Sequence, residues 1–245
     1  MVKNIIIIPT FNEIENISAI IHKTFECYHD VHILVVDDSS PDGTASVVKE
    51  LIPTLNNKLH LLVRAEKSGL GTAYIAGFNW ALEHDYEYII EMDADFSHNP
   101  KHVRRLIDKA QQGADVVVGS RYVREGKIEN WPLDRRILSY GGALYARMIT
   151  GLPVKDPTAG FVCYHRSVLE EIDLRKISSV GYSFQIEMKY AAFRLGKQLA
   201  EVPITFIDRV RGQSKMDGSI INEAALGVIR MRLQEKNFYR KRPIA

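Results

Sequence analysis

Short apolar segments alternate with amphipathic segments along the first half of the chain, and this alternation constrains the fold more than any other feature. The apolar segments are Ile5–Ile8, Ile33–Val36, Leu59–Val63, Tyr88–Met92 and Val116–Val118. They are apolar on both faces, which is typical of strands buried inside a parallel sheet. The amphipathic segments, predicted as helices, are Glu15–Glu26, Thr44–Leu51, Thr72–Glu83 and Pro100–Gln112. The pattern predicts an α/β fold with a mostly parallel sheet and helices on both faces.

The loops that follow three of these strands carry polar and acidic residues. They are Pro9–Glu13, Asp37–Gly43 and Asp93–Asp95. Ligands of open α/β sheets bind outside the carboxyl ends of the strands. We therefore expect the chemistry of this protein to lie in these loops.

The composition excludes several classes of function. With 245 residues, 46% of them hydrophobic, the chain can bury a large core, and its formal net charge of +2 argues against nucleic-acid binding. Cys27 and Cys163 have neither metal-ligand spacing nor a disulfide pattern, which favours a reducing, cytoplasmic compartment. No apolar run approaches the roughly 18 residues that a membrane span requires. A lipid substrate would be met at the membrane surface.

Asp93 and Asp95 follow a predicted strand and are two residues apart. If the chain turns there, both carboxylates can face one cleft, where Mg²⁺ or Mn²⁺ would need only one or two of them together with phosphate oxygens. Such a cation neutralises charge on a leaving diphosphate. The alternative for an isolated Asp-x-Asp is a solvated turn.

The loop from Asp37 to Thr44 has the composition of a strand-to-helix turn, so Asp42 and Gly43 can be turn residues only. Asp38, at the end of the strand, can instead accept a hydrogen bond from a nucleobase. Neither a dinucleotide fingerprint nor a Lys-Ser or Lys-Thr phosphate loop is present. Lys67–Thr72 is interpreted as a close-packed helix start.

Several motifs occur in an order that resembles the GT-A glycosyltransferases of family 2, and within them the dolichol-phosphate (polyprenol-phosphate) mannosyltransferases. The motifs are Pro9-Thr10-Phe11-Asn12-Glu13, Asp37–Thr44, Gly69-Leu70-Gly71-Thr72-Ala73-Tyr74 and Asp93-Ala94-Asp95-Phe96-Ser97-His98. Two later segments, Asp156–Phe161 and Gly181–Met188, also match in order, and the resemblance spans about residues 4 to 218. It implies a GT-A fold.

The resemblance also implies roles in donor binding. Residues around the base and ribose would be Pro9, Phe11, Glu13, Val36 and Asp38. Ribose, diphosphate and metal would be handled by Asp93, Ala94 and Asp95, with Asp95 the principal ligand. Some relatives have a Gln where this chain has Ser97, a weaker ligand, so the third protein ligand stays open. His98 could contribute, but a surface histidine is the simpler interpretation.

The segment that begins at Trp131 is predicted to be a helix with two distinct faces. Arg135 and Ser139 are four residues apart on one face, and with Arg121 they have the chemistry of phosphate recognition. The resemblance implies that all three contact the acceptor phosphate. An apolar stripe is either core packing, which an amphipathic pattern alone favours, or a lipid-facing surface, which the resemblance favours. Its residues are Ile137, Gly141, Leu144, Met148 and Leu152, flanked by Leu138, Tyr145 and Ile149.

Three features lie near the carboxyl terminus. As a bare charge run, the segment from Arg209 to Lys215 would more often be a solvated turn. Its match to the family's Arg-x-x-Gly-x-Ser-Lys segment implies that Arg209 and Lys215 contact the phosphates when the loop closes. Glu187 occupies the position of a catalytic base in relatives that glycosylate hydroxyls, but a phosphate acceptor needs none, so we expect a structural role. Ile220–Leu233 is predicted as an amphipathic helix, and the basic, aromatic tail after it is either membrane-binding or merely solubilising.

These observations predict a GT-A domain over residues 1–218, with a donor half (1–120) and an acceptor half (121–218), followed by a helix and basic tail over 219–245. The expected reaction is inverting transfer of a hexose, mannose from GDP-mannose, to polyprenyl phosphate on the cytoplasmic face of a membrane. A membrane-anchoring subunit is a possible partner. The alternatives are UDP-glucose as donor, a carbohydrate hydroxyl as acceptor, or a non-catalytic nucleotide-sugar-binding subunit.

Overall fold

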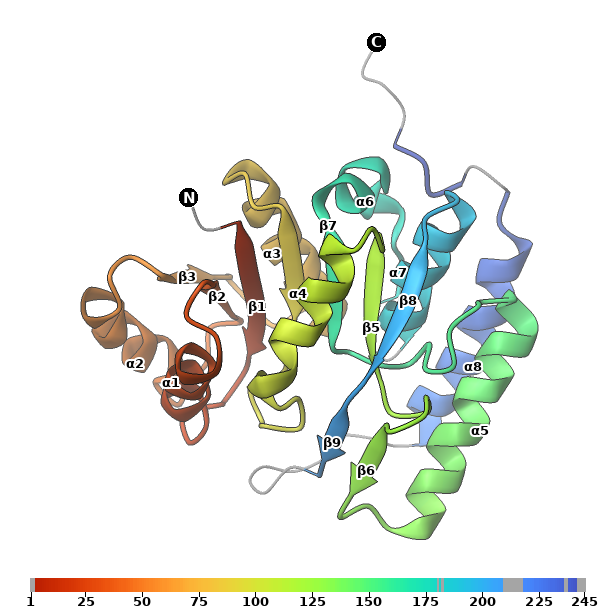
Figure 1. The fold of residues 1–245 in the computed structure, drawn as a ribbon, viewed down its shortest axis with the longest axis horizontal. Helices are drawn as coiled ribbons and strands as arrows, with labels where there is room; N and C mark the ends of the chain where they lie inside the picture. The colour runs from red at the N-terminus through yellow and green to blue at the C-terminus, as the bar shows by residue number, and fades with distance from the viewer. Residues whose placement is uncertain (1–2, 180, 182, 209–217, 236–237, 242–245) are drawn as a thin grey trace.

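A mostly parallel sheet forms the centre of the molecule (Figure 1). The computed structural model describes residues 3–179, 181, 183–208, 218–235 and 238–241. The sheet has the strand order β3-β2-β1-β4-β7-β5-β8. Its strands are β1 (Asn4–Thr10), β2 (His32–Asp37), β3 (Leu59–Val63), β4 (Tyr88–Glu91), β5 (Val116–Ser120), β7 (Val162–His165) and β8 (Leu199–Pro203). Only β7 runs antiparallel to its neighbours, β4 and β5. The five strands predicted from the sequence are confirmed.

Helices cover both faces of the sheet, because successive side chains of each strand point to opposite faces. Ile6 and Ile8 face a layer made of α1 (Ile17–Cys27), α2 (Thr44–Leu51) and α4 (Val103–Gln111). Ile5 and Ile7 face a layer that contains α3 (Leu70–Glu83), α6 (Arg166–Glu171) and α7 (Ser183–Arg194). Short 3₁₀ turns are η1 (Ile52–Thr54), η2 (Pro100–His102) and η3 (Leu174–Lys176).

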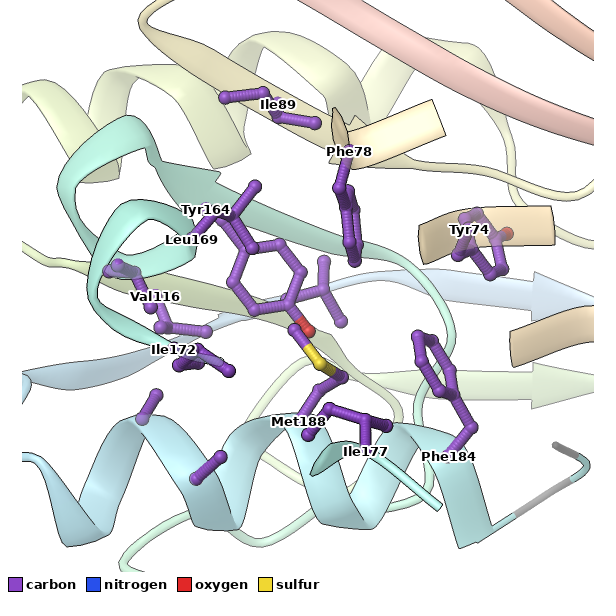
Figure 2. Close-up of a cluster of buried hydrophobic side chains, with 14 of the residues drawn as sticks. Tyr74, Phe78, Ile89, Val116, Tyr164, Leu169, Ile172, Ile177, Phe184 and Met188 are labelled. Carbon is purple, nitrogen blue, oxygen red and sulfur yellow. The ribbon is translucent and has the colours of Figure 1, made fainter. Parts of the chain in front are cut away.

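Aromatic rings fill the second of these layers (Figure 2). Tyr74 stacks on Phe184 with ring centroids 6.0 Å apart, and Phe78 meets Tyr164 edge to face at 5.5 Å. The start of α3 is packed so closely that a Cβ on Gly71 would lie 2.6 Å from the Phe184 ring. This confirms the interpretation of Lys67–Thr72 as a close-packed helix start.

Two long helices and a small sheet follow β5 in the chain. Helix α5 (Leu133–Thr150) lies beside α8 (Gly218–Leu233) at one side of the molecule (Figure 1). The Tyr145 hydroxyl donates to the Ala225 carbonyl at 3.0 Å, and Val228 and Met231 are buried in the same core as α3 and α7. Strands β6 (Lys127–Glu129) and β9 (Thr205–Ile207) pair in parallel. No helix in the described ranges is long and apolar enough to cross a membrane.

The stripe of α5 divides between the two interpretations: Leu152, just after the helix, is buried and the flanking Tyr145 and Ile149 pack against the core, whereas the other large apolar side chains of the stripe are exposed. Ile137 is 64% exposed and Met148 is 69% exposed, whereas small residues, Ala143 and Ala146, are buried against the protein. Further exposed apolar side chains on the two neighbouring helices are Leu133, Leu138, Tyr140, Leu144, Leu226, Ile229 and Leu233. We call these nine side chains the apolar ridge.

The chain after α8 returns to the core. Tyr239 is 1% exposed, and its backbone carbonyl accepts a hydrogen bond from Asp173 N at 2.8 Å. Arg240 pairs with Glu171 at 2.7 Å. Within the described residues 238–241, the two aromatic residues and Arg240 thus contact the core, with partners in α6, α7 and η3.

Candidate active site

A cavity at the carboxyl ends of β4 and β5 brings the two halves of the predicted site together. Asp93, Asp95 and Ser97 enter it from the loop after β4. Arg121 enters from the end of β5, and Arg135 from the first turn of α5. The predicted metal-binding group and two of the three predicted acceptor-phosphate groups thus line one space, although 40 residues separate Asp95 from Arg135 in the chain.

A sharp turn at Phe96, whose φ is +63°, lets both aspartates of the Asp-x-Asp segment reach the cavity. Asp93 Oδ1 accepts a hydrogen bond from the Tyr74 hydroxyl at 3.2 Å, and burial with the Asp93 charge raises the Tyr74 pKa well above its ordinary value. Asp95 Oδ1 accepts one from Ser97 N at 3.0 Å.

The two aspartates suit a hard divalent cation that also binds a diphosphate. Within the described ranges, no group of three or more His, Cys, Asp or Glu side chains is placed to hold a metal ion. A complete protein cage is therefore absent from that part of the chain. Mg²⁺ typically takes one or two carboxylates and completes its shell with phosphate and water oxygens. The donor set fits that mode.

His98 is not a surface histidine: it is 2% exposed and lines the cavity. Its ring stacks on Phe161 with centroids 5.0 Å apart, and its Nδ1 accepts a hydrogen bond from Asp93 N at 3.1 Å. Because Nδ1 acts as the acceptor, the neutral ring carries its proton on Nε2. His98 in this tautomer is a hydrogen-bond donor and braces the backbone of Asp93, which argues against its being a metal ligand.

Arg121 is held by the loop that precedes β7. Its Nε and Nη2 donate to the two carboxylate oxygens of Asp156, each at 2.7 Å, and Nη2 also donates to Thr158 Oγ1 at 2.8 Å. Asp156 is fully buried, and Arg121 holds its pKa below the ordinary value against the effect of burial. The guanidinium is therefore fixed in direction.

The ion pair of Arg135 is more accessible to solvent than that of Arg121. Its Nη1 donates to both carboxylate oxygens of Asp208 at 2.9 and 3.0 Å, and each side chain is 25% exposed. The guanidinium also lies over the Trp131 ring, 4.1 Å from its centroid. Trp131 itself lines the cavity and is 8% exposed.

Ser139, the third residue predicted to contact the acceptor phosphate, lies farther from the cavity than Arg121 and Arg135, which line it. It is not among the residues that line the cavity in the described structure, and its hydroxyl accepts a hydrogen bond from the Tyr122 hydroxyl at 2.7 Å. Tyr122 in turn lies next to Arg121 in the chain, with the guanidinium 5.1 Å from its ring. Ser139 is thus linked to the site through Tyr122.

The predicted nucleotide-binding residues lie along the neighbouring strand ends. Pro9 of β1 is in register with Val36 of β2, and Asp38 follows β2 directly. The Asp38 carboxylate lies 3.3 Å from Arg64 Nε. Burial raises the Asp38 pKa, and Arg64 opposes that shift. Val36 is 0% exposed and Ala94 is 3% exposed, so neither residue offers appreciable surface to a nucleotide in this structure.

Two further predicted residues lie in the loop after β1. Lys67 places its ammonium 4.1 Å from the centre of the Phe11 ring. Glu13 accepts a hydrogen bond from Asn16 Nδ2 at 2.9 Å, and its backbone N donates to Thr44 Oγ1 at 3.0 Å. These contacts fix the loop beside the start of α2.

Glu187 is buried away from the cavity and has structural partners. Its carboxylate accepts hydrogen bonds from the backbone N of Ser178 at 3.1 Å and of Ser179 at 2.8 Å, and from the Tyr239 hydroxyl at 3.3 Å. These contacts support the structural role expected for it. Arg209 and Lys215 lie outside the described residues.

Sequence reasoning gave no role in the site to several residues that line the cavity or hold its side chains. They are Trp131, Asp156, Thr158, Gln185 and Asp208. Asp156, Thr158 and Gln185 fall within segments that match the family in order. This match was the one sequence feature that could have pointed to a role for them in the site. The roles of Asp156, Thr158 and Asp208 could not be assigned because their arginine partners, Arg121 and Arg135, are far away in the chain.

Comparison with known proteins agrees with this geometry. The sequence profile of the family described as Glycosyl transferase family 2 matches residues 5–173. The polyprenol monophosphomannose synthase of Mycolicibacterium smegmatis is 46% identical over 226 residues, covering 92% of this chain and 85% of that protein. The undecaprenyl-phosphate mannosyltransferase of Micrococcus luteus is 46% identical over 224 residues, covering 91% of each chain.

Solved structures show the same fold. Mannosyl-3-phosphoglycerate synthase from Rubrobacter xylanophilus gives a TM-score of 0.68 at 19% identity, covering 95% of this chain and 74% of that one. Glucosyl-3-phosphoglycerate synthase from Mycobacterium tuberculosis, solved with Mn²⁺, UDP and phosphoglyceric acid, gives 0.65 at 19% identity, covering 94% and 78%. The expected GT-A fold is confirmed.

Proposed function

The chain belongs to glycosyltransferase family 2, and from this premise we propose that it transfers mannose from GDP-mannose to the phosphate of a polyprenyl lipid. The observation that carries the proposal is that Asp93, Asp95, Arg121 and Arg135 all line one cavity. This cavity combines carboxylates suited to a metal–diphosphate group with guanidinium groups suited to a phosphate. The two relatives that are 46% identical, named for polyprenol and undecaprenyl-phosphate mannosylation, support the same substrates.

In the proposed reaction an oxygen of the lipid phosphate attacks the anomeric carbon of the sugar. The bond from that carbon to the diphosphate breaks, GDP leaves, and the configuration inverts in one displacement. Arg121 and Arg135 orient the phosphate, and Ser139 supports them through Tyr122. When bound by Asp93 and Asp95, with Ser97 nearby, Mg²⁺ or Mn²⁺ would supply charge neutralisation at the leaving diphosphate.

The arrangement needs no protein base. A phosphate monoester has a second pKa of about 6 and is largely dianionic at neutral pH. Glu187, the residue in the position of a base, is buried and bonded to Ser178, Ser179 and Tyr239. This placement favours a phosphate acceptor over a carbohydrate hydroxyl.

The remaining predicted residues complete the proposal. Pro9, Phe11, Glu13, Val36 and Asp38 would surround the base and ribose at the strand ends next to the cavity. We propose that Arg209 and Lys215, which lie outside the described residues, contact the phosphates. The donor is then enclosed between the ends of β1 and β2 and the cavity.

We also propose that the protein contacts the cytoplasmic surface of a membrane through the apolar ridge. Arg135 on the cavity wall belongs to the same helix as the exposed Ile137 and Met148, so a lipid phosphate bound at the cavity would have its chain beside the ridge. The free thiols of Cys27 and Cys163 suit a reducing compartment. An anchoring subunit could cover the same ridge.

A donor-by-acceptor assay tests the proposal. Purified protein is incubated with radiolabelled GDP-mannose or UDP-glucose, with Mg²⁺ or Mn²⁺ or EDTA, and with polyprenyl phosphate or a soluble mannoside. We expect a lipid-extractable, mannose-containing product from GDP-mannose and polyprenyl phosphate only, and none with EDTA. A product from UDP-glucose would replace the donor assignment, whereas glycosylation of the mannoside alone would refute the acceptor assignment. Binding of nucleotide without turnover would indicate a non-catalytic subunit.

A further inference from the structure

A lysine without solvent exposure lies directly beneath the cavity. Lys189, on α7, is 0% exposed, and its Nζ lies 2.7 Å from the Ala159 carbonyl, 2.9 Å from the Gln185 carbonyl and 3.2 Å from Gln185 Oε1. An ammonium group has three donors and no acceptor, so three oxygen partners match its charged form. Burial lowers the Lys189 pKa to about 8, and nearby carboxylates oppose the shift.

The charge of Lys189 belongs to a buried cluster. Glu91 of β4 is 0% exposed, burial raises its pKa to about 8, and Lys189 opposes that shift. Gln185, whose Oε1 meets Lys189, also favours the ionised form of Glu91. Asp156 favours the ammonium form of Lys189, and Arg121 disfavours it. Lys189 therefore interacts electrostatically with ionisable groups of β4, of the loop before β7 and of the end of β5.

Hydrogen bonds hold both ends of the loop from Lys155 to Ala159, which binds Arg121. At its start, the backbone N groups of Lys155 and Asp156 donate to the Glu201 carboxylate at 2.8 and 3.0 Å. At its end, the Ala159 carbonyl accepts from Lys189. Between these anchors Asp156 holds the Arg121 guanidinium through two hydrogen bonds. Removing the second anchor would free the loop on the side that faces the cavity.

We propose that Lys189 is a positioning residue for the acceptor phosphate: by holding the Ala159 carbonyl it fixes the loop that aims Arg121 into the cavity. This inference rests on the proposed function, because it assumes that Arg121 contacts the phosphate. Burying an ammonium costs several kcal/mol, and apolar residues of similar volume often replace buried ion pairs without loss of stability. If Lys189 only filled volume in the core, a methionine of similar size would serve there equally well.

The test separates positioning from stability with a charge-free double variant. Lys189→Met alone removes the donor of the Ala159 and Gln185 carbonyls and the ammonium that favours the ionised form of Glu91, and it is expected to lower Tm. Glu91→Gln combined with Lys189→Met removes both ionisable groups and should recover part of the lost Tm. In both variants we expect the KM for polyprenyl phosphate to rise about tenfold or more, because small misplacements of a binding group cost that much. The Kd for GDP with Mg²⁺ should stay within about twofold.

A matched control is Lys197→Met, which removes a partly buried pair with Glu171 away from the cavity. It should lower Tm slightly and leave the acceptor KM unchanged. An acceptor KM that recovers together with Tm in the double variant, or that never changes, would overturn the inference while the proposed function stands. A wild-type protein that glycosylates no phosphate acceptor would refute the proposed function and this inference together.

Discussion

The apolar ridge gives a quantitative prediction for membrane binding. Ile137 and Met148 are 64% and 69% exposed on α5. Complete burial of such a side chain is worth about 1.5–3 kcal/mol, so immersing the exposed two-thirds gains about 1–2 kcal/mol for each residue. Replacing both with glutamine, which keeps the helix propensity, should weaken binding by about 2–4 kcal/mol in total. That loss corresponds to a roughly 30- to 700-fold drop in vesicle affinity.

Sedimentation with phosphatidylglycerol vesicles measures the effect directly. The matched control is Ile14→Gln with Val63→Gln, two exposed apolar residues (44% and 47%) outside the ridge, which should change vesicle affinity little. Surface substitutions of this kind typically change stability by no more than about 0.5 kcal/mol, so both doubles should unfold like the wild type. Equal loss in both doubles, or no loss in the ridge double, would refute the assignment of the ridge to the membrane.

Three further substitutions test the packing and the site. Gly71→Ala forces a Cβ to within 2.6 Å of Phe184 and should lower Tm by about 2–10 °C in thermal unfolding; an unchanged Tm would contradict the packing. His98→Asn keeps an acceptor for the Asp93 N–H and should retain more Mn²⁺-dependent GDP binding by calorimetry than His98→Ala; the reverse order would contradict the bracing role. Arg135→Gln should raise the acceptor KM by roughly tenfold or more while GDP binding stays unchanged. An equal loss of acceptor use and GDP binding would disprove the assignment of Arg135 to the acceptor.

The donor half could be predicted from the sequence because its information is local. Each strand there is a short apolar run, each helix is an amphipathic segment, and the turn residues stand between them. Thr44–Leu51 and Leu59–Val63 match the structure to the residue. The acidic loops follow the strands directly, so the sheet alone brings Asp38 and Asp93 to the same edge.

The acceptor half resisted prediction because its contacts join distant segments. Strand β7 has only four residues, and its antiparallel place between β4 and β5 depends on pairing with strands far away in the chain. On α5 the large apolar side chains indicated one buried face, but the helix packs through Ala143 and Ala146 together with Tyr145 and Ile149, and leaves Ile137, Leu144 and Met148 exposed. Hydrophobic periodicity shows that a helix has two faces, yet it does not show which face a neighbouring helix covers.

The two arginines of the cavity have different electrostatic settings, and this difference supports a division of work between them. Arg121 and Asp156 are 8% and 0% exposed, so breaking their pair would leave an uncompensated buried charge, at a typical cost of about 3–5 kcal/mol. Arg135 and Asp208 are each 25% exposed, and pairs nearer to water are worth far less. If the acceptor phosphate binds to these two arginines, as proposed, it can displace Asp208 from Arg135 more easily than Asp156 from Arg121. Arg121 would then orient the phosphate, and Arg135 would exchange its bond to Asp208 for one to the phosphate.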